Sequence, residues 1–375
     1  MDTLVNDDAI ATLRSWMTEH ALPLWASTGW DGTHGGFVER LGADGTPDRD
    51  APRRTFVQAR QIYCYAKAAQ FDWHPNAKQI ALDGLEALLK LRGTDTENGF
   101  PHLTAADGAV LDAKRDTYDL AFVLLAQATL LGLTGDAQVR AEIDRNLLFL
   151  DQKLRSSHGG FVEELPQRPP RRQNPQMHLF EAMIALFDAT GEPVFQQRAG
   201  EFFGLFSASL FDGRSATLGE YYEEDWSNIQ PVRVEPGHLA EWTWLLKGFE
   251  RITGCPTGRH RSALMPSLLR YRDASGCLTD EGDRDGTITQ TTRKLWPQTE
   301  LAKAWIAQAE GGEDGAADEA RQALARLQAL YLDHPVRGGW HAQLDADGRS
   351  TIDTIPASAL YHILCALSEA QQVLA

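Results

Sequence analysis

The chain has 375 residues, of which 43% are hydrophobic and 23% are charged, an ordinary composition for a globular protein that buries a sizeable core. This composition excludes an intrinsically disordered chain. The 36 Lys and Arg residues against 52 Asp and Glu residues give a formal net charge of −16, so we expect no binding to nucleic acid or to anionic membranes. A phosphorylated substrate would need a local basic pocket.

The beginning of the chain and its cysteines predict a cytoplasmic protein. Residues 1–24 include Asp2, Asp7 and Asp8 and lack the basic start and the apolar run of a signal peptide. We find no run of about 18 apolar residues and therefore expect no membrane span. The four cysteines have no C-x-x-C spacing, which is typical of a reducing compartment.

Twelve helical stretches follow one another along the chain, each with apolar residues at helical spacing. Prolines near several starts, as at Pro175, Pro236 and Pro356, suit the first helical turn, where a missing N–H costs nothing. The predicted starts lie near Asp8, Thr55, Ala77, Thr117, Ala137, Asn174, Pro193, Pro236, Arg259, Thr292, Ala316 and Pro356.

Short glycine-containing segments recur between pairs of these helices, at intervals of 57 to 63 residues. Three of them run into an Asp-Gly turn, at Asp44-Gly45, Asp107-Gly108 and Asp347-Gly348, and therefore predict short β-hairpins. The apolar residues that mark the repeat are Phe37, Phe100, Phe161, Leu218, Leu278 and Trp340.

Six helix pairs at a constant period can stack as an open array or close into a ring. An open array needs polar terminal caps, whereas the last predicted helix, 357–374, is as apolar as the middle ones. We therefore predict an all-α fold, an (α/α)6 barrel of twelve helices with short β-hairpins in the loops. It is expected to form one catalytic domain, 1–375, with no internal boundary.

A candidate site emerges when the first helix of each pair is aligned, because equivalent positions in a closed ring face the same axis. The alignment places six polar side chains at one end of the barrel, and convergent polar groups in a concavity are the default site. Three of the six are histidines, the usual general acids and bases near pH 7. The aligned residues are Gln58, Asp119, His178, His238, Gln298 and His362.

Two of these histidines have a glutamate three residues later on the same helical face, Glu181 after His178 and Glu241 after His238. Such a carboxylate can orient the imidazole and raise its basicity, although a lone His-x-x-Glu is more often a capping or surface pair. The register across repeats favours the functional interpretation for His238 and His362.

Other residues on the inner helices allow two readings. Arg60, in an otherwise apolar stretch, could bind an anionic or polyhydroxylated partner or form a salt bridge to Asp119. Trp242 and Trp296 could stack on sugar rings or fill the core, whereas core filling is favoured for Trp244.

Cofactor motifs are not found. The sequence has no G-x-G-x-x-G after a strand, P-loop, G-x-S-x-G or H-E-x-x-H. A three-histidine metal site is geometrically possible, but the histidines belong to different helices, so we expect no metal and no cofactor.

Four segments, 174–182, 235–246, 293–300 and 356–362, resemble the N-acylglucosamine 2-epimerase superfamily, and the resemblance spans nearly the whole chain. It implies an (α/α)6 barrel in which His238 and His362 are the acid/base pair. It also implies that Glu241 supports His238, that Arg60 contacts substrate oxygens, and that His178 and Asn174 belong to the pocket. Two departures are Phe56, where many relatives have tryptophan, and Gln176, where many have histidine.

The chain looks most like the mannose isomerase branch, which implies interconversion of D-mannose and D-fructose through a cis-enediolate, with D-lyxose and D-xylulose as a side activity. Two histidines and an arginine suffice for this chemistry. A sugar 2-epimerase of the mannose/glucose, N-acylglucosamine or cellobiose type is the alternative.

A glycoside hydrolase and a non-catalytic sugar-binding barrel are weaker readings, because the ring contributes histidines more than acids. The net charge favours an unphosphorylated monosaccharide, although Arg53, Arg54 and Arg172 could form an anion pocket. We expect a monomer or a homodimer.

Overall fold

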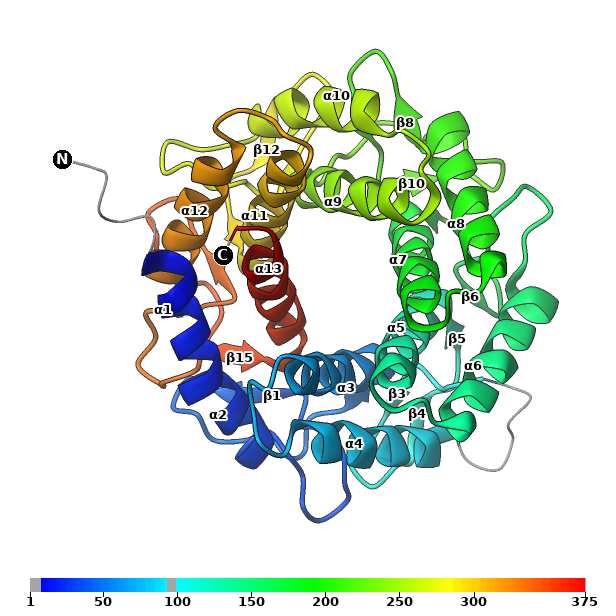
Figure 1. Cartoon of the computed structure of the whole chain (residues 1–375), viewed down its shortest axis with the longest axis vertical. Coiled ribbons are helices and arrows are strands. Elements are labelled where there is room, and N and C mark those ends of the chain that lie inside the picture. The colour runs from blue at the N-terminus through cyan, green and yellow to red at the C-terminus, as the bar shows by residue number, and fades with distance from the viewer. Residues whose placement is uncertain (1–7, 93–98, 375) are drawn as a thin grey trace.

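The computed structural model describes residues 8–92 and 99–374, which form two concentric rings of helices (Figure 1). The inner ring consists of α3 (Thr55–Gln70), α5 (Thr117–Thr134), α7 (Gln173–Thr190), α9 (Pro236–Thr253), α11 (Leu295–Glu310) and α13 (Leu360–Val373). The outer ring consists of α1 (Asp8–Trp16) with α2 (Leu22–Ser27), α4 (Ala77–Arg92), α6 (Ala137–Phe149), α8 (Pro193–Leu205), α10 (Gly258–Leu269) and α12 (Ala316–Leu327). With 8–27 counted as one continuous helix, the described chain has twelve, and the predicted (α/α)6 barrel is confirmed.

Four outer helices pass into a five-residue π turn that the 3.6-residue period did not predict. The turns are Met17–Ala21 between α1 and α2, Leu150–Leu154 after α6, Phe206–Leu210 after α8, and Gln328–Leu332 after α12. Each turn keeps two side chains buried, for example Leu150 and Leu154. The wider turn changes the direction of the chain, so that the two buried side chains of each turn stay packed against the inner ring.

Inner helices are buried on most sides because each packs against two inner neighbours and an outer helix. In α5, 13 of the 18 residues are buried. By length and composition α5 is also apolar enough to cross a membrane, contrary to the expectation that the chain has no such stretch, but 72% of that window is buried inside the barrel. Its position in the inner wall therefore accounts for its apolar character.

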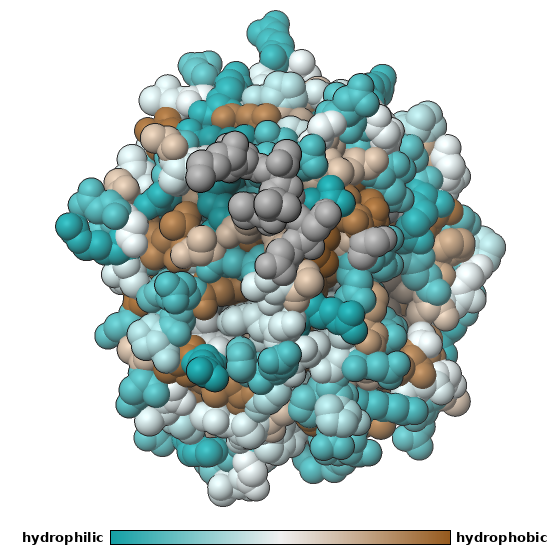
Figure 2. Space-filling model, turned by 60° about the vertical axis from the view of Figure 1, so that its left-hand side comes forward, coloured by the Kyte–Doolittle hydropathy of each residue, from teal (hydrophilic) through white to brown (hydrophobic). Residues whose placement is uncertain are grey.

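The outer surface is polar by comparison. On the face shown in Figure 2, hydrophobic side chains lie in small patches separated by hydrophilic ones. The large hydrophobic side chains that are most exposed are scattered among different elements: Val110, Leu111, Leu148, Val194 and Ile352.

Short antiparallel strands join each repeat to the next at the end of the barrel where the inner helices begin. Residues just before one inner helix pair with the hairpin of the following repeat. The pairs are β2 (Arg53–Arg54) with β3 (Leu103–Thr104), β5 (Arg115–Asp116) with β6 (Glu164–Leu165), β7 (Arg171–Arg172) with β10 (Tyr221–Tyr222), β13 (Arg293–Lys294) with β14 (Gln343–Leu344), β15 (Thr354–Pro356) with β1 (Arg40–Gly42), and a bridge from Val234 to Gly282.

Other strands form local hairpins within a repeat. They are β3 with β4 (Val110–Asp112), β8 (Phe211–Asp212) with β9 (Thr217–Leu218), and β11 (Glu281–Gly282) with β12 (Ile288–Gln290). The predicted Asp107-Gly108 turn joins β3 to β4, with Gly108 at a φ of 89°. The markers Phe37, Phe161 and Leu278 each form an isolated β-bridge to a residue six or seven positions earlier.

The ring is closed by the last strand pair. Arg40 in β1 lies opposite Pro356 in β15, and Gln61 Nε2 in α3 donates a 2.7 Å hydrogen bond to the carbonyl oxygen of Ala357. These contacts join the first inner helix to the sixth, so the array has no free end.

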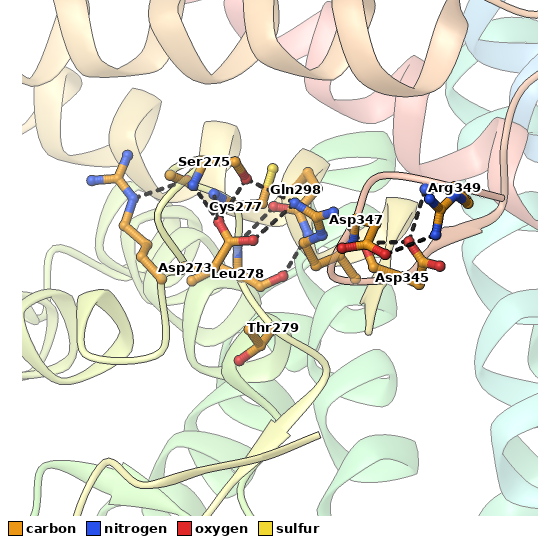
Figure 3. A network of polar contacts seen from close by, with 12 residues as sticks. Asp273, Ser275, Cys277, Leu278, Thr279, Gln298, Asp345, Asp347 and Arg349 are labelled. Atoms are coloured by element: carbon orange, nitrogen blue, oxygen red, sulfur yellow. Dashed lines mark hydrogen bonds and ion pairs between the residues drawn. The ribbon is translucent and has the colours of Figure 1, made fainter. Parts of the chain in front are cut away.

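Three glutamines hold the hairpins against the inner helices. The side-chain amide of Gln58 bonds both the N–H and the carbonyl oxygen of Phe37, each at 2.8 Å. Gln298 bonds Leu278 in the same way, at 2.8 and 2.9 Å, as Figure 3 shows. Gln176 does the same for Phe161. These glutamines are therefore structural equivalents spaced two repeats apart.

Candidate active site

A cavity of about 190 Å³ lies at the end of the barrel where the inner helices begin. Its wall is built by residues in the first two turns of these helices or immediately before them. Eight of the eleven predicted site residues lie in this wall. The lining residues are Phe56, Arg60, Tyr118, Asn174, His178, Glu235, His238, Glu241, Trp296, Ser358 and His362.

Three predicted site residues do not line the cavity. Gln298 is occupied by the backbone of Leu278. Asp119 bonds His102 Nδ1 at 2.7 Å and accepts from the backbone N–H of Phe56, so it fixes the start of α3. Trp242 is fully buried and donates to Gln173 Oε1 at 2.7 Å, which makes it a core residue.

His238 contacts a carboxylate from the preceding hairpin. Its Nδ1 lies 2.8 Å from Glu220 Oε2 and 3.8 Å from Glu235. Gln173 Nε2 donates to the same Glu220 oxygen at 3.2 Å. Burial by itself would lower the pKa of His238, but the Glu220 charge and hydrogen bond, aided by Glu235, raise this pKa to about 9. His238 is therefore an imidazolium at neutral pH, and the carboxylate that orients it is Glu220 instead of the expected Glu241.

His362 has the opposite charge state. Its Nδ1 lies 2.8 Å from Glu300 Oε1, and the other oxygen of Glu300 lies 2.6 Å from Lys303 Nζ. Burial, together with the positive charges of Arg60 and Lys303, holds the pKa of His362 well below its ordinary value. His362 is therefore a neutral imidazole, available as a base.

The indole of Trp296 lies between the two imidazoles, with ring centroids 4.9 Å from His238 and 5.7 Å from His362. It reaches this position because Gly237 has no side chain. A Cβ on Gly237 would lie 2.5 Å from the Trp296 ring. Gly237 therefore allows the Trp296 indole to approach both imidazoles.

Arg60 is a buried cation without a carboxylate partner among the described residues. Its Nη2 donates to the Tyr118 hydroxyl at 2.8 Å and its Nη1 to the carbonyl oxygen of Ser358 at 3.3 Å. The rings of Phe122 and Tyr361 lie 4.1 and 4.9 Å from its guanidinium. The expected alternative, a salt bridge to Asp119, does not form because Asp119 contacts His102. An unneutralised guanidinium in a cavity favours an oxygen that gains negative charge.

His178 and Glu241 complete the floor of the cavity. His178 Nδ1 lies 2.9 Å from Glu181 Oε2, and burial lowers the pKa of His178 to about 4, so its ring is neutral. Burial, then the charge of Glu300, raises the pKa of Glu241 well above its ordinary value. Glu241 is therefore a neutral acid, and its buried Oε1 has no hydrogen-bond partner in the protein. Asn174 Oδ1 is likewise buried and unpartnered. Both atoms are free for a ligand.

Metal binding is geometrically possible at the cavity. Ligand atoms of Glu220, Glu235 and His238 lie within 4.8 Å of one another, as do those of Glu241, Glu300 and His362. In both groups the imidazole nitrogen that contacts the carboxylate is Nδ1. These contacts are the hydrogen bonds expected of oriented acid/base histidines.

The cavity thus combines two histidines in opposite charge states with an arginine that has no carboxylate partner among the described residues, an arrangement suited to moving protons on a small polar molecule. A family model described as N-acylglucosamine 2-epimerase (GlcNAc 2-epimerase) matches residues 35–366, and the chain belongs to this family. It is therefore an isomerase or epimerase that acts on sugars.

Named relatives include enzymes of both kinds. A mannose-6-phosphate isomerase of Rhizobium meliloti (strain 1021) is 35% identical over 390 residues, which cover 96% of each chain. A D-mannose isomerase of Thermobifida fusca is 27% identical over 365 residues, covering 90% of this chain and 88% of the relative. The structure of a cellobiose 2-epimerase from Bacillus thermoamylovorans B4167 matches with a TM-score of 0.87 at 18% identity, covering 97% of this chain and 100% of that one.

Sequence reasoning missed two carboxylates that contact the catalytic candidates. Glu220 belongs to a hairpin 18 residues before His238, and Glu300 lies 62 residues before His362 on a different helix. The structure also adds Tyr118, Glu235 and Ser358 to the cavity wall. Glu300 had a usable signal, because it follows Gln298 by two residues as Arg60 follows Gln58 and His178 follows Gln176.

Proposed function

We propose that this protein is an aldose–ketose isomerase that interconverts D-mannose and D-fructose through a cis-enediolate. The observation that carries the proposal is the pair of histidines in opposite charge states on either side of Trp296. Isomerisation needs one group that removes a proton from carbon and another that handles protons on oxygen, and this pair supplies both.

His362, as the neutral imidazole, takes the proton from C2 and delivers it to C1. His238, as the imidazolium, protonates the ring oxygen during opening and then moves protons between O1 and O2. The guanidinium of Arg60 offsets the charge that develops on the enediolate oxygens. Glu241, as a neutral acid with an unpartnered oxygen, hydrogen-bonds the same oxygens.

The dimensions of the cavity favour a monosaccharide. Its volume of about 190 Å³ equals that of about six water molecules at about 30 Å³ each, so a second sugar unit would have to lie outside it. D-lyxose shares the configuration of D-mannose at C2, C3 and C4, and its conversion to D-xylulose is the side activity that we propose.

The charges around the cavity favour an unphosphorylated sugar. Arg54 bonds the buried carboxylate of Glu39, and Arg172 bonds that of Glu163 at 2.7 Å. Arg53 forms an ion pair with Asp31. The three arginines that could have made an anion pocket are therefore each paired with a carboxylate, and Arg60 is the arginine among the cavity-lining residues that is left for the reacting oxygens. Mannose 6-phosphate stays in the test because a relative at 35% identity carries the name of an isomerase for that sugar.

A 2-epimerase is the second candidate. His238 and His362 both line the cavity, so the same two imidazoles could act on opposite faces of C2. The low pKa of His362 and the high pKa of His238 favour a single carbon base and therefore the isomerase. We further propose that residues 1–375 form one catalytic domain, acting in the cytoplasm as a monomer or homodimer without metal or cofactor.

The test is to incubate the purified protein with D-mannose, without added metal or nucleotide, and to identify the products by NMR. We expect D-fructose as the first product. D-glucose as the first product would reassign the protein as a 2-epimerase, and turnover of mannose 6-phosphate alone would refute the charge argument.

A further inference from the structure

A second and larger cavity, of about 1010 Å³, lies at the opposite end of the barrel, where the inner helices end. Its wall carries cations and carboxylates in similar numbers, among them Lys67, Lys247, Asp188 and Glu310. Neither set is in excess, so the wall does not select an ionic ligand. Its polar character is that of a space that holds water.

Glu181 separates the two cavities. It lines the large cavity, while its hydrogen-bond partner His178 lines the smaller cavity of the candidate active site. Glu181 Oε2 lies 2.9 Å from His178 Nδ1, and Glu181 Oε1 accepts from the Tyr361 hydroxyl. The buried Glu181 carboxylate thus contacts a residue of the candidate active site on one side and lines the large cavity on the other.

Glu241 connects Glu181 to the proposed carbon base. A carboxyl oxygen of Glu241 lies within 4.8 Å of ligand atoms of both His178 and Glu181, and a carboxyl oxygen of the same residue lies within 4.8 Å of those of both Glu300 and His362. Glu241 is a neutral acid, whereas Glu181 is a carboxylate, because its contacts with His178, Lys303 and Tyr361 outweigh the effect of burial and lower its pKa. A proton donor therefore lies beside a proton acceptor, in the direction of the large cavity.

We propose that the large cavity is a proton port, an opening through which the carbon base His362 exchanges its proton with solvent. The proton passes by way of Glu241 and Glu181 while the sugar fills the smaller cavity of the candidate active site. This proposal rests on the proposed isomerase function. The imidazolium of His362 gives a proton to Glu241 as Glu241 passes its own to Glu181, across gaps of at most 4.8 Å that one water molecule each can bridge, and Glu181 releases it to water. In heavy water a deuteron returns by the same path, so the charge of the cluster and the bonds of the sugar are unchanged.

The port has a measurable consequence. The proton taken from C2 either reaches C1 directly or is replaced by a solvent deuteron before it is delivered. The fraction of D-fructose that carries deuterium at C1 after isomerisation in heavy water therefore measures the rate of proton exchange through the port relative to the rate of proton delivery to C1.

Two variants block the port in different ways. Glu181→Gln keeps an oxygen that accepts from His178 Nδ1 but cannot take up a proton. Ala185→Phe places a ring over Glu181 from the cavity side, because a helical side chain leans back toward the residue four positions earlier. Ala185→Ser is the matched control, since it leaves the cavity open at the same position.

We expect the deuterium fraction to fall at least fivefold in Glu181→Gln and Ala185→Phe and to stay unchanged in Ala185→Ser, with kcat within twofold of wild type for the two Ala185 variants. An unchanged fraction in Ala185→Phe, or a wild-type product without deuterium, would overturn the port but leave the isomerase standing. A fall in kcat of Glu181→Gln at constant deuterium fraction would make Glu181 only a positioning residue for His178. Absence of any sugar turnover would overturn both proposals.

Discussion

Replacing Glu220 with glutamine tests the charge state on which the mechanism depends. Glu220 contributes the nearest negative charge to His238, at 2.8 Å, and opposes the burial that would otherwise lower the pKa of this imidazole. Without that charge we expect the pKa of His238 to fall from about 9 to below its ordinary 6.5. Because a tenfold change in proton affinity is about 1.36 kcal/mol, the Glu220 charge contributes roughly 3 kcal/mol to the protonation of His238.

The effect on catalysis follows from the fraction of His238 that is protonated. An acid must carry its proton, so activity falls as the pH rises through the pKa of His238. In the wild type this decline comes at about pH 9, and in Glu220→Gln it moves below about pH 6.5. At pH 8 we expect kcat to fall at least about 30-fold, because at most about one molecule in thirty keeps the proton, whereas the loss at pH 6 should be more than about twentyfold smaller.

The assay is the pH dependence of kcat for D-mannose, together with an NMR titration of the His238 ring. Glu235→Gln is the matched control, because Glu235 lies 3.8 Å from His238 Nδ1 and its removal should move the alkaline limb less. Glu241→Gln should move it least, since Glu241 is already neutral. A Glu220→Gln enzyme that keeps its alkaline limb near pH 9 would refute the assignment of His238 as the acid.

The other predictions concern the proposed base His362, the contact between Gly237 and Trp296, the hydrogen bonds from Gln298 to a hairpin, and metal dependence. His362→Asn should fold normally yet lose exchange of the C2 hydrogen of D-mannose with solvent; exchange at the wild-type rate would remove His362 from the mechanism. Gly237→Ala places a Cβ about 2.5 Å from Trp296 and should lower kcat/KM at least tenfold while costing roughly 1–3 kcal/mol of stability, as calorimetry and kinetics can verify. Gln298→Ala leaves the buried N–H and carbonyl groups of Leu278 unpaired and should lower the unfolding free energy by about 1–3 kcal/mol in urea titrations without changing KM; a change in KM alone would place Gln298 in the site after all. EDTA dialysis should leave kcat unchanged, and a loss restored by one divalent ion would contradict the metal-free mechanism.

Much of the fold could be predicted because each repeat shows its helices and its hairpin in short-range sequence patterns. Apolar spacing revealed the helices, and the glycine-containing segments revealed the period, so the ring of inner helix starts followed. The register within that ring was less accurate: Gln58 and Gln298 hold hairpins by hydrogen bonds to their backbone. The residues two positions after the three hairpin-holding glutamines are Arg60 and His178, which line the cavity, and Glu300, which contacts the cavity residue His362. Polar type alone cannot distinguish a side chain that bonds backbone from one that faces a cavity.

The charge states of the histidines could not be predicted from spacing. A His-x-x-Glu pair places Glu241 on the same helix as His238, but the carboxylate in contact is Glu220. Glu220 directly precedes β10, and hydrogen bonds between its backbone N–H and Arg233 and between its carboxylate and the N–H of Glu235 place it at the start of α9. For His178 the local pair does form, with Glu181 at 2.9 Å. Whether a local pair forms depends on which neighbouring repeat offers a better-placed partner, and that information is tertiary.

The pairing of β1 with β15 changes how the molecule must come apart. In an open stack of helix pairs the terminal unit has one neighbour and frays first, so stability is a sum over neighbouring units. Here residues 40–42 and 354–356 are strand partners, and every helix pair has two neighbours. Fraying has no starting point, and opening any one junction exposes two new apolar faces at once. The barrel should therefore unfold in a single cooperative transition whose slowest refolding step is the joining of segments more than 300 residues apart.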